Sequence, residues 1–368
     1  MKKSSCTRIL LVVLSLLMLI SLVACAFPPA PTEPTDPTTD PTDPSEPTNP
    51  SLLPPQTPNR VSYKTLPSLV VRRDLTINAG IGEKVVISQL TDVHLSYYNE
   101  EDLKDPVLKE CHDVYDWRKD NATLPNLQNT LKQAAKDSDL IVITGDLYSY
   151  HSQGNMDTLK EHVFDKYDNV IATLGNHDVD RQSDKCTLED PVSYDELRAS
   201  IAAEWCNDIT YTSQIIKDKV MVIALDNSTS HFLSEQVPLM TADLQKAREN
   251  GYVVLVFYHY PLLTGDPADD ATYADSKYSS KTPAFTAKLG TNTSELVGPH
   301  STGADKGIYD LITNNGDIIY GAFCGHIHGD FYVEIQAKTA AGEEVMIPQY
   351  LIQSVAYDEG HYLKITIE

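Results

Sequence analysis

The sequence predicts an α/β protein, and two observations carry this prediction. Six segments of mostly apolar residues, rich in Val and Ile, are each followed by polar residues. Between several of them lie stretches with the periodicity of an amphipathic helix. Near-continuous apolar runs are typical of strands that are buried on both faces of a sheet. Strands that alternate with helices along the chain indicate stacked layers of sheet and helix.

The elements can be placed by residue number. The predicted strands begin at Lys84, Asp139, Asp168, Lys219, Tyr252 and Gly316. Helices are predicted over residues 124–136, 155–167 and 239–251; in the first, Leu124, Leu127 and Leu131 fall on one face. After the last of the six strands, residues 330–336, 344–357 and 361–368 are predicted to form a run of antiparallel strands.

Residues 1–24 are predicted to be an export signal and not part of the fold. Lys2, Lys3 and Arg8 precede an apolar stretch from Ile9 to Ala24, which is short for a membrane span. The stretch ends in "LVAC", which resembles the lipobox of bacterial lipoproteins. That resemblance implies a lipid on Cys25 and an exported protein held at the cell surface by the bacterial membrane. An ordinary signal peptide or a membrane anchor remains the alternative.

A tether is predicted over residues 25–59. Twelve of the 22 prolines of the chain lie between Pro28 and Pro58, and five acidic residues are interspersed with them. Such a segment cannot pack a core and is expected to be extended and semi-rigid. Residues 60–368 are therefore predicted to form the folded domain.

Charge and cysteine content limit the function classes. The formal net charge of -23 argues against binding to a nucleic-acid polymer, which needs a basic surface. Exported chains can form disulfides, and spacing favours Cys186 with Cys206 as a pair, although the pairing of Cys111, Cys186, Cys206 and Cys324 stays open. Nothing in the sequence indicates the oligomeric state.

Polar side chains end five of the predicted strands. They are Asp92 and His94, then Asp146, then Asn176 and His177, then His259, and finally His326 and His328. In open α/β sheets the carboxyl ends of strands lie along one edge, where ligands bind. The sequence therefore predicts that these side chains meet in a metal site.

The motifs at these strand ends resemble those of the calcineurin-like metallophosphoesterases. In order along the chain they are "DVH" (92–94), "GD" (145–146), "GNHD" (175–178), a histidine after an apolar strand (259) and "GHIH" (325–328). The resemblance implies a four-layer β-sandwich of two mixed sheets flanked by helices. It also implies hydrolysis of phosphate mono- or diesters by attack of a metal-bound hydroxide.

The same resemblance implies two metal ions and a role for each residue. Asp92, His94 and His328 would hold the first ion; Asn176, His259 and His326 would hold the second; Asp146 would bridge them. Imidazole and carboxylate ligands suit Fe, Mn or Zn. His177 would act as the general acid or stabilise the charge of the phosphate.

The sequence also departs from known branches of that family. Purple acid phosphatases carry tyrosine, and the family's protein phosphatases carry aspartate, at the position that Ser149 occupies here. Tyr148 and Tyr150 miss that register by one residue, so a tyrosinate–iron site is not expected. The arginine motif of the protein phosphatases is absent as well. The partner that orients His177 is left open, with Asp178 as the adjacent carboxylate.

Two questions remain open from the sequence. Long connections over 96–123, 179–208 and 262–307 could shape a pocket, and several tyrosines beside the metal motifs could stack a base or a sugar or simply fill half-buried positions. His151, five residues after Asp146, is an additional candidate. The alternative function is a metal-binding surface adhesin or sensor on a phosphoesterase fold that has lost catalysis.

Overall fold

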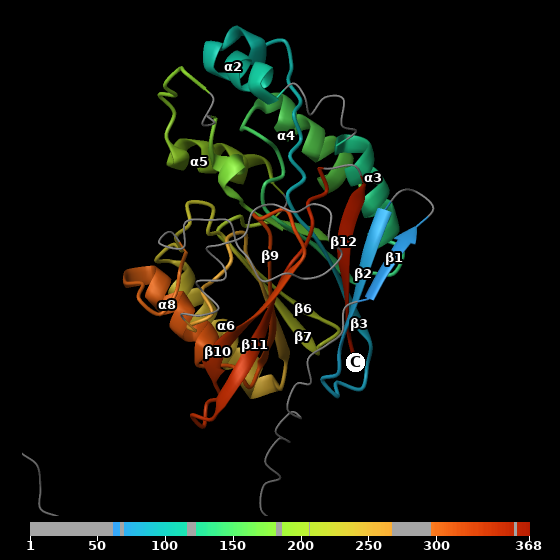
Figure 1. Cartoon of the computed structure of the whole chain (residues 1–368), viewed down its shortest axis with the longest axis vertical. Helices are drawn as coiled ribbons and strands as arrows, with labels where there is room; N and C mark the ends of the chain where they lie inside the picture. The colour runs from blue at the N-terminus through green and yellow to red at the C-terminus, as the bar shows by residue number, and fades with distance from the viewer. Residues whose placement is uncertain are drawn as a thin grey trace, which may run out of the picture. The chain divides into compact units, whose positions relative to one another are not determined.

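The computed structural model describes residues 62–66, 70–115, 123–181, 186–205, 207–266, 296–356 and 359–368 (Figure 1). All of them belong to one compact unit, Asn49–Glu368. The predicted signal, Cys25, the tether and Cys206 lie outside the described residues. Among the residues that are described, no helix is long and apolar enough to cross a membrane.

Two mixed sheets of six strands form the centre of the fold. The first contains, in spatial order, β1 (Ser62–Leu66), β2 (Val70–Ile77), β12 (Gly360–Ile367), β3 (Val85–Leu90), β4 (Leu140–Thr144) and β5 (Val170–Thr173). The second contains β10 (Phe331–Lys338), β11 (Glu344–Leu351), β9 (Ile319–Cys324), β8 (Val253–Phe257), β7 (Val220–Leu225) and β6 (Tyr211–Ile216). The α/β class and the pair of mixed sheets are confirmed.

Parallel strands run through the middle of each sheet. In the first, β3 pairs in parallel with β4, and β4 with β5. In the second, β7, β8 and β9 are parallel neighbours. Their carboxyl ends therefore meet at one edge of each sheet, which is the arrangement that brings strand-end residues together.

The parallel strands are mostly apolar because both of their faces are buried. Along β4, Leu140 and Val142 pack between the two sheets, and Ile141 and Ile143 pack against the helices outside. The period of two along a strand alternates the faces in this way. β8 repeats the pattern, and the one polar residue of these two strands is Thr144, at the end of β4.

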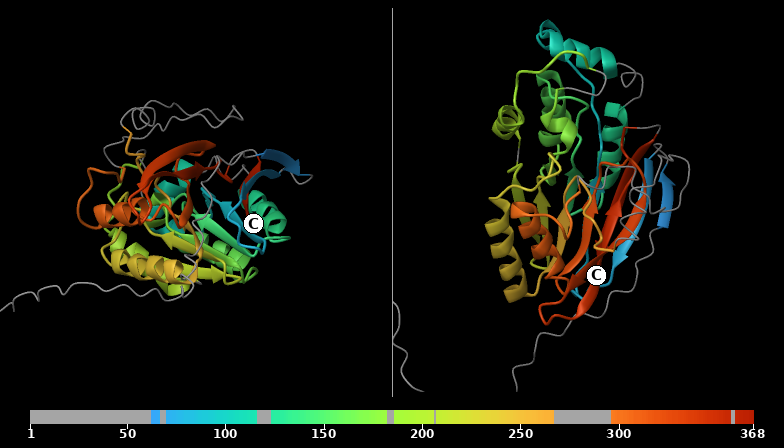
Figure 2. Two further views of the ribbon diagram at one scale, coloured as in Figure 1. Left: turned by 90° about the horizontal axis from the view of Figure 1, so that it is seen from below. Right: turned by 60° about the vertical axis from the view of Figure 1, so that its left-hand side comes forward.

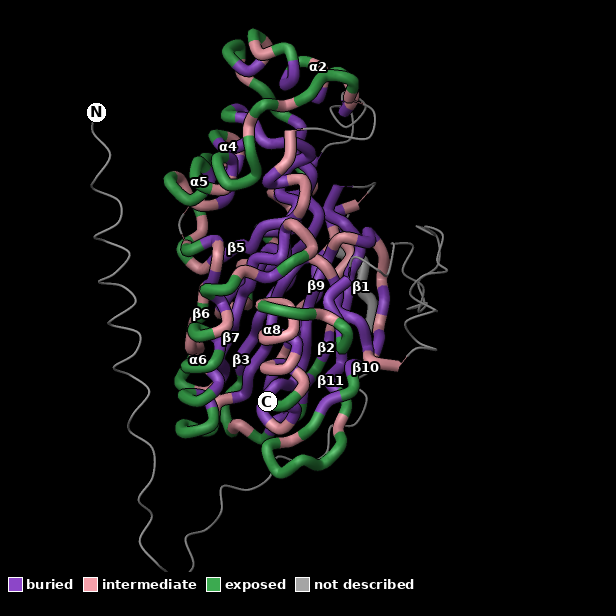
Figure 3. The backbone as a smooth tube through the Cα atoms, turned by 90° about the vertical axis from the view of Figure 1, so that its left-hand side faces the viewer, coloured by how far each residue is buried: buried purple, intermediate pink, exposed green. Residues whose placement is uncertain are grey.

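Helices cover the outer face of each sheet. Outside the first sheet lie α3 (Thr123–Ala134), α4 (Gln153–Leu159) and the π-helical turn η3 (Lys160–Phe164); outside the second lie α6 (Gln236–Asn250) and α8 (Gly303–Thr313). Figure 2 shows these layers from two sides, and Figure 3 shows buried strands beneath helices with exposed outer faces. The four layers are helix, sheet, sheet and helix.

Shorter elements lie beyond the strand ends. They are η1 (Asp102–Lys104), α2 (Pro106–Tyr115), η4 (Asn176–Val179) and α5 (Tyr194–Glu204). In Figure 1, α2 lies at the far end of the fold, past the ends of the strands. We call α2 together with residues 180–181 and 186–190 the cap.

The elements differ from the prediction in three ways. The three expected helices are present within a few residues, but α2 and α5 lie in stretches that the sequence assigned to long connections, and α8 begins in the last of these stretches. Strands β1, β2 and β6 were not predicted. In the tail, β10 and β11 are antiparallel neighbours, whereas β12 crosses to the other sheet and pairs in parallel with β2. The prediction of one antiparallel run was wrong at that strand, because strand periodicity does not say which sheet a strand joins.

Candidate metal centre

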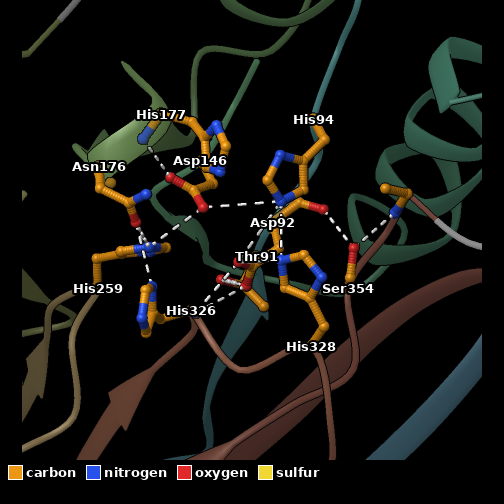
Figure 4. Close-up of polar contacts among 12 residues, drawn as sticks. Thr91, Asp92, His94, Asp146, Asn176, His177, His259, His326, His328 and Ser354 are labelled. Atoms are coloured by element: carbon orange, nitrogen blue, oxygen red, sulfur yellow. Dashed lines mark hydrogen bonds and ion pairs between the residues drawn. The ribbon is translucent and has the colours of Figure 1, made fainter. Parts of the chain in front are cut away.

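The structure brings together all seven side chains that the sequence assigned to metal binding (Figure 4). Each lies two to four residues past the end of a strand. Asp92 and His94 follow β3, Asp146 follows β4, Asn176 follows β5, His259 follows β8, and His326 and His328 follow β9. The carboxyl ends of five strands from two sheets thus deliver side chains to one place.

The first group consists of Asp92, His94, Asp146 and His328, and every member is buried. One potential ligand atom from each lies within 4.8 Å of all the others. The Nε2 atoms of His94 and His328 are 2.8 Å apart, and His328 Nε2 is 3.0 Å from Asp92 Oδ1. Lone pairs of imidazole and carboxylate therefore point toward one small volume.

The second group consists of Asp146, His259 and His326, with the amide of Asn176 between the two imidazoles. Asn176 Oδ1 lies 3.2 Å from His259 Nε2 and 3.1 Å from His326 Nδ1. An amide oxygen beside two imidazole nitrogens brings three potential ligand atoms to one position.

Asp146 belongs to both groups. Its Oδ2 atom is 3.7 Å from His94 Nε2 and 3.3 Å from His259 Nε2. The Asp146 carboxylate could therefore contact a ligand bound by either group.

The buried carboxylate and imidazole groups of the site shift one another's pKa values. Burial opposes ionisation of Asp146, but the imidazoles of His259 and His177 outweigh it and hold the pKa of Asp146 well below its ordinary value. Burial also works against a charged His259, yet the Asp146 carboxylate raises the pKa of His259 to about 9. For His326, burial and then His259 lower the pKa to about 3. The carboxylates thus require positive charge beside them, which a bound cation supplies.

The backbone at the site is strained. Eight non-glycine residues of the described chain have positive φ, and five of them are Asp92, His94, Asp146, His326 and His328. This left-handed conformation costs about 1 kcal/mol or more for a side chain with a Cβ atom. It turns each side chain at the end of its strand toward the shared centre.

Glycines allow the loops to approach one another. A Cβ atom on Gly145 would lie 2.6 Å from both Gly175 N and His259 Nδ1. A Cβ atom on Gly175 would collide with Asp146 Oδ1 and lie 2.8 Å from His259 Cε1. Side chains cannot be accommodated at either position, so these glycines set the spacing of the ligand loops.

Three supporting residues were not identified from the sequence. Thr91 Oγ1 donates to Asp92 Oδ2 at 2.6 Å, and Ser354 Oγ donates to the Asp92 carbonyl at 2.6 Å. Asn227 accepts from the backbone N–H groups of His259 and Tyr260 through one Oδ1 atom. Asn227 also ends a strand, so the rule that found the other residues could have found it.

His259 is fixed by its other ring nitrogen as well. Its Nδ1 lies 2.8 Å from the carbonyl of Thr144, and since a carbonyl can only accept, Nδ1 carries the hydrogen. Nε2 is then the nitrogen that faces Asp146. This arrangement is typical of histidines that bind metals.

His177 lies beside the two groups rather than within them. Its backbone N–H donates to Asp146 Oδ1 at 2.9 Å, and its ring Nδ1 donates to the carbonyl of Ser149 at 2.8 Å. Asp178, in contrast, points away and accepts from the backbone N–H groups of Leu147, Tyr148 and Gly175. The main chain at Ser149 is therefore the partner that the sequence left open.

Two other sequence candidates lie elsewhere. His151 is buried between the Tyr148 hydroxyl and Ser200 Oγ, at 3.0 and 2.9 Å, and contacts neither group. Of the tyrosines beside the motifs, Tyr148, Tyr150 and Tyr258 are buried in the core, as expected for residues that fill space. Tyr260 differs, because its ring lies 4.0 Å from that of His326.

The fold and the site define an α/β sandwich protein with a buried Asp/His cluster that is able to bind metal ions. The profile of the family described as calcineurin-like phosphoesterase matches residues 85–330. The chain therefore belongs to the calcineurin-like phosphoesterase family, and its membership supports a hydrolase.

Solved structures also resemble this chain. A dimetal phosphatase from Danio rerio has 12% sequence identity and a TM-score of 0.40, with 74% of this chain and 88% of that chain covered. The calcineurin-like phosphoesterase YfkN from Bacillus subtilis has 16% identity and a TM-score of 0.30, with 74% and 82% covered. No curated protein matches the chain.

Proposed function

We propose that the protein hydrolyses phosphate mono- or diesters with two metal ions held by the seven clustered side chains. The observation that carries this proposal is the position of Asp146, whose Oδ2 lies near an imidazole of each group. The proposed ligands are Asp92, His94 and His328 for one ion and Asn176, His259 and His326 for the other, with Asp146 between them. Fe, Mn and Zn match this set of nitrogen and oxygen donors.

When bound, two such ions would supply the chemistry that polarises the phosphate oxygens and lowers the pKa of a nucleophilic water. The residues of the chain do the rest. The strained loops and the close glycines hold the donors in place before substrate arrives, which removes a reorganisation cost from the reaction. Thr91 and Ser354 keep the Asp92 loop fixed.

His177 is the proposed proton donor. Because its Nδ1–H is engaged by the Ser149 carbonyl, Nε2 is the nitrogen that faces the site. As an imidazolium it can donate from Nε2 to the leaving oxygen, and afterwards it regains a proton from water. The fixed Nδ1 contact sets the direction of that transfer.

The test is metal analysis together with hydrolysis. The full-length protein, purified without chelator, should carry close to two metals per chain and should cleave nitrophenyl phosphate or bis(nitrophenyl) phosphate when Mn, Zn or Fe is added. Asp146→Asn should lower the metal content of both positions and reduce kcat/KM by more than about 100-fold, because even residues behind the ligands contribute about 10–100-fold. Asp165→Asn, at a side chain that is 60% exposed, is the matched control.

Two results would count against the proposal. If Asp146→Asn keeps two metals and full activity, the bridging role is wrong. If the metal-loaded protein cleaves none of a broad panel of phosphate esters, the alternative of a metal-binding adhesin or sensor is favoured.

We further propose that the enzyme is exported and held at the cell surface by a lipid on Cys25. The lipobox-like "LVAC" and the proline-rich tether that follows it support this location. Mass spectrometry of the mature N-terminus should find a diacylglyceryl cysteine, and Cys25→Ser should release or mislocalise the protein. A mature chain that starts at another residue would contradict the proposal.

A further inference from the structure

We infer that Cys111 and Cys186 form a disulfide that cross-links the cap next to the metal centre. Cys111 lies on α2, and Cys186 lies in the segment that follows η4. In the structure both side chains are thiols, and their Sγ atoms are 3.7 Å apart. A disulfide needs roughly 2.05 Å, so the two sulfurs have to approach by roughly 1.7 Å.

The contacts around the two cysteines hold them in register. Glu110 and Thr187, the residues next to them, are joined directly, because the Glu110 carboxylate accepts from Thr187 N at 2.9 Å and from Thr187 Oγ1 at 2.6 Å. The same carboxylate accepts from Leu188 N at 2.9 Å. Residues 110 and 111 thus face 187 and 186.

Arg181 fixes the other side of the segment. It forms ion pairs with Asp105, just before α2, and with Asp190 at 3.3 Å. The Cys111 thiol donates to the Arg181 carbonyl. Arg181, before Cys186, contacts Asp105 just before α2, and Thr187, after it, contacts Glu110 in the middle of α2. Formation of the disulfide therefore requires only a small side-chain movement.

Cys111 is buried in a small apolar cluster, and Cys186 is half-buried at its side. Cys111 packs with Val107, Leu108, Tyr115 and Tyr150, and Cys186 packs against this cluster. This small core is separate from the three larger cores, which lie between the sheets and outside each sheet. A small core supplies little hydrophobic stabilisation, and cross-links are the usual compensation.

The bond would form by exchange with an external disulfide, such as oxidised glutathione or a thiol oxidoreductase. The thiolate of Cys186, the more accessible of the two, attacks the external disulfide, forms a mixed disulfide and releases one thiol. The thiolate of Cys111 then attacks the Cys186 sulfur and releases the second thiol. Two protein thiols are oxidised, one external disulfide is reduced, and the two protons of the protein thiols end on the two released thiolates, which become thiols.

The cross-link has a functional consequence that rests on the proposed function. Tyr115, one helical turn after Cys111 on α2, places its ring 6.0 Å from that of His177 in an edge-on arrangement. A fixed α2 therefore fixes Tyr115 over the side of the site where the leaving group would lie.

Thiol trapping tests the bond itself. The full-length protein, exported by a bacterial host, is denatured with N-ethylmaleimide so that buried thiols react, and it is digested without reductant. We expect a linked peptide pair that joins Cys111 to Cys186, also in the control variant Cys206→Ser. Alkylation of both cysteines, or a link between Cys186 and Cys206, would overturn the inference.

Thermal unfolding tests what the bond does. It closes a loop between residues 75 apart, so reduction should lower the Tm of the wild type by roughly 5–10 °C. The double variant Cys111→Ser/Cys186→Ser should be insensitive to reductant, and an equal response from both proteins would overturn the stabilising role.

Kinetics separate the bond from the proposed function. Reduction should raise KM several-fold with less change in kcat if Tyr115 helps to position the ester. Unchanged kinetics in a protein that has the linked peptide would overturn the positioning role of the bond. Absence of any hydrolysis would count against the proposed function and leave the mass-spectrometric result intact.

Discussion

The ring Nδ1 of His177 donates a hydrogen bond to the main-chain carbonyl of Ser149 over 2.8 Å. The sequence resemblance to purple acid phosphatases and to protein phosphatases would place tyrosine or aspartate at this position, where the chain has Ser149. Here the side chain at that position instead donates to the His94 carbonyl at 3.1 Å. The orientation of the proposed acid therefore comes from the backbone, and replacing the serine side chain should not remove it.

Loss of His177 should depend on the leaving group. A nitrophenolate is stable without a proton, whereas an alkoxide needs one in the transition state. His177→Ala should therefore lower kcat by about 10²–10⁴-fold on an alkyl phosphate and by much less on a nitrophenyl ester, with metal content unchanged. Steady-state kinetics on both substrates, with elemental analysis, provide the measurement.

Two variants control this experiment. Ser149→Ala should retain the same leaving-group dependence as the wild type, because the acceptor is a carbonyl. His231→Ala, at an imidazole that is 66% exposed, should change nothing. An equal loss across leaving groups in His177→Ala would assign the residue to charge stabilisation, and a loss of metal would place it among the ligands.

Gly175→Ala should damage the metal centre more than the fold. The added methyl group would collide with Asp146 Oδ1 and crowd the His259 ring, so the loops must separate. We expect at least about tenfold weaker metal binding, measured by titration of the metal-stripped protein. Gly342→Ala is the control, because nothing lies within 4 Å of its Cβ position although its φ is +84°. It should cost about 1–2 kcal/mol of stability and leave metal binding as it was.

Asn227→Ala should weaken the group that contains His259. Asn227 Oδ1 accepts from the N–H groups of His259 and Tyr260, at 2.9 and 3.0 Å, and its Nδ2 donates to the Tyr260 carbonyl at 2.9 Å. Removing it leaves buried N–H groups without an acceptor, at about 1–3 kcal/mol each. We expect one of two metals to be lost first on dialysis. Asn227→Asp, which keeps the acceptor, should retain more metal than Asn227→Ala; equal losses would refute this positioning role.

His151 should make the fold sensitive to mild acid. Burial, and then the nearby Arg181, lower the pKa of His151 to about 4, so the folded protein keeps it neutral while the unfolded chain takes up a proton near pH 6.5. Its contribution is complete above pH 6.5 and is lost as the pH falls from there toward 4. Between pH 7 and 5 this amounts to roughly 2 kcal/mol.

Urea unfolding at pH 7 and pH 5 measures this dependence. His151→Asn removes the titrating group and should lose less stability over that interval than the wild type does. Both proteins should be compared in their metal-loaded and metal-stripped forms, because the ligands also titrate. Identical pH dependence in the wild type and the variant would show that His151 is not responsible.

Much of the fold and the site could be predicted because the signals are local. A strand buried on both faces, such as β4, is apolar at almost every position, and the polar residue that follows it is easily recognised in the sequence. Parallel strands then bring Asp92, Asp146 and Asn176 to one edge whatever the remaining details. From these local signals one can predict the family, the two sheets and the meeting of the seven side chains.

The edge strands and the helices beyond the strand ends have weaker hydrophobic patterns in the sequence. β2 has the sequence VVRRDLTI, with buried and half-buried positions mixed, and α2 and α5 lie in stretches that lack a long apolar run. The apolar residues of β2, α2 and α5 pack on partners from distant parts of the chain, so the hydrophobic periodicity within each element is weak.

The sequence by itself determined which strands are buried and which side chains end them, because both depend on the chemistry of a few consecutive residues. Only the tertiary structure decided that the carbonyl of Ser149 orients His177, that β12 joins the first sheet, and that Cys111 lies beside Cys186. Every residue has a main-chain carbonyl, so the sequence does not indicate which carbonyl accepts the hydrogen bond from His177. The two cysteines are 75 residues apart, and their approach depends on how the cap folds over the strand ends, which no local pattern encodes.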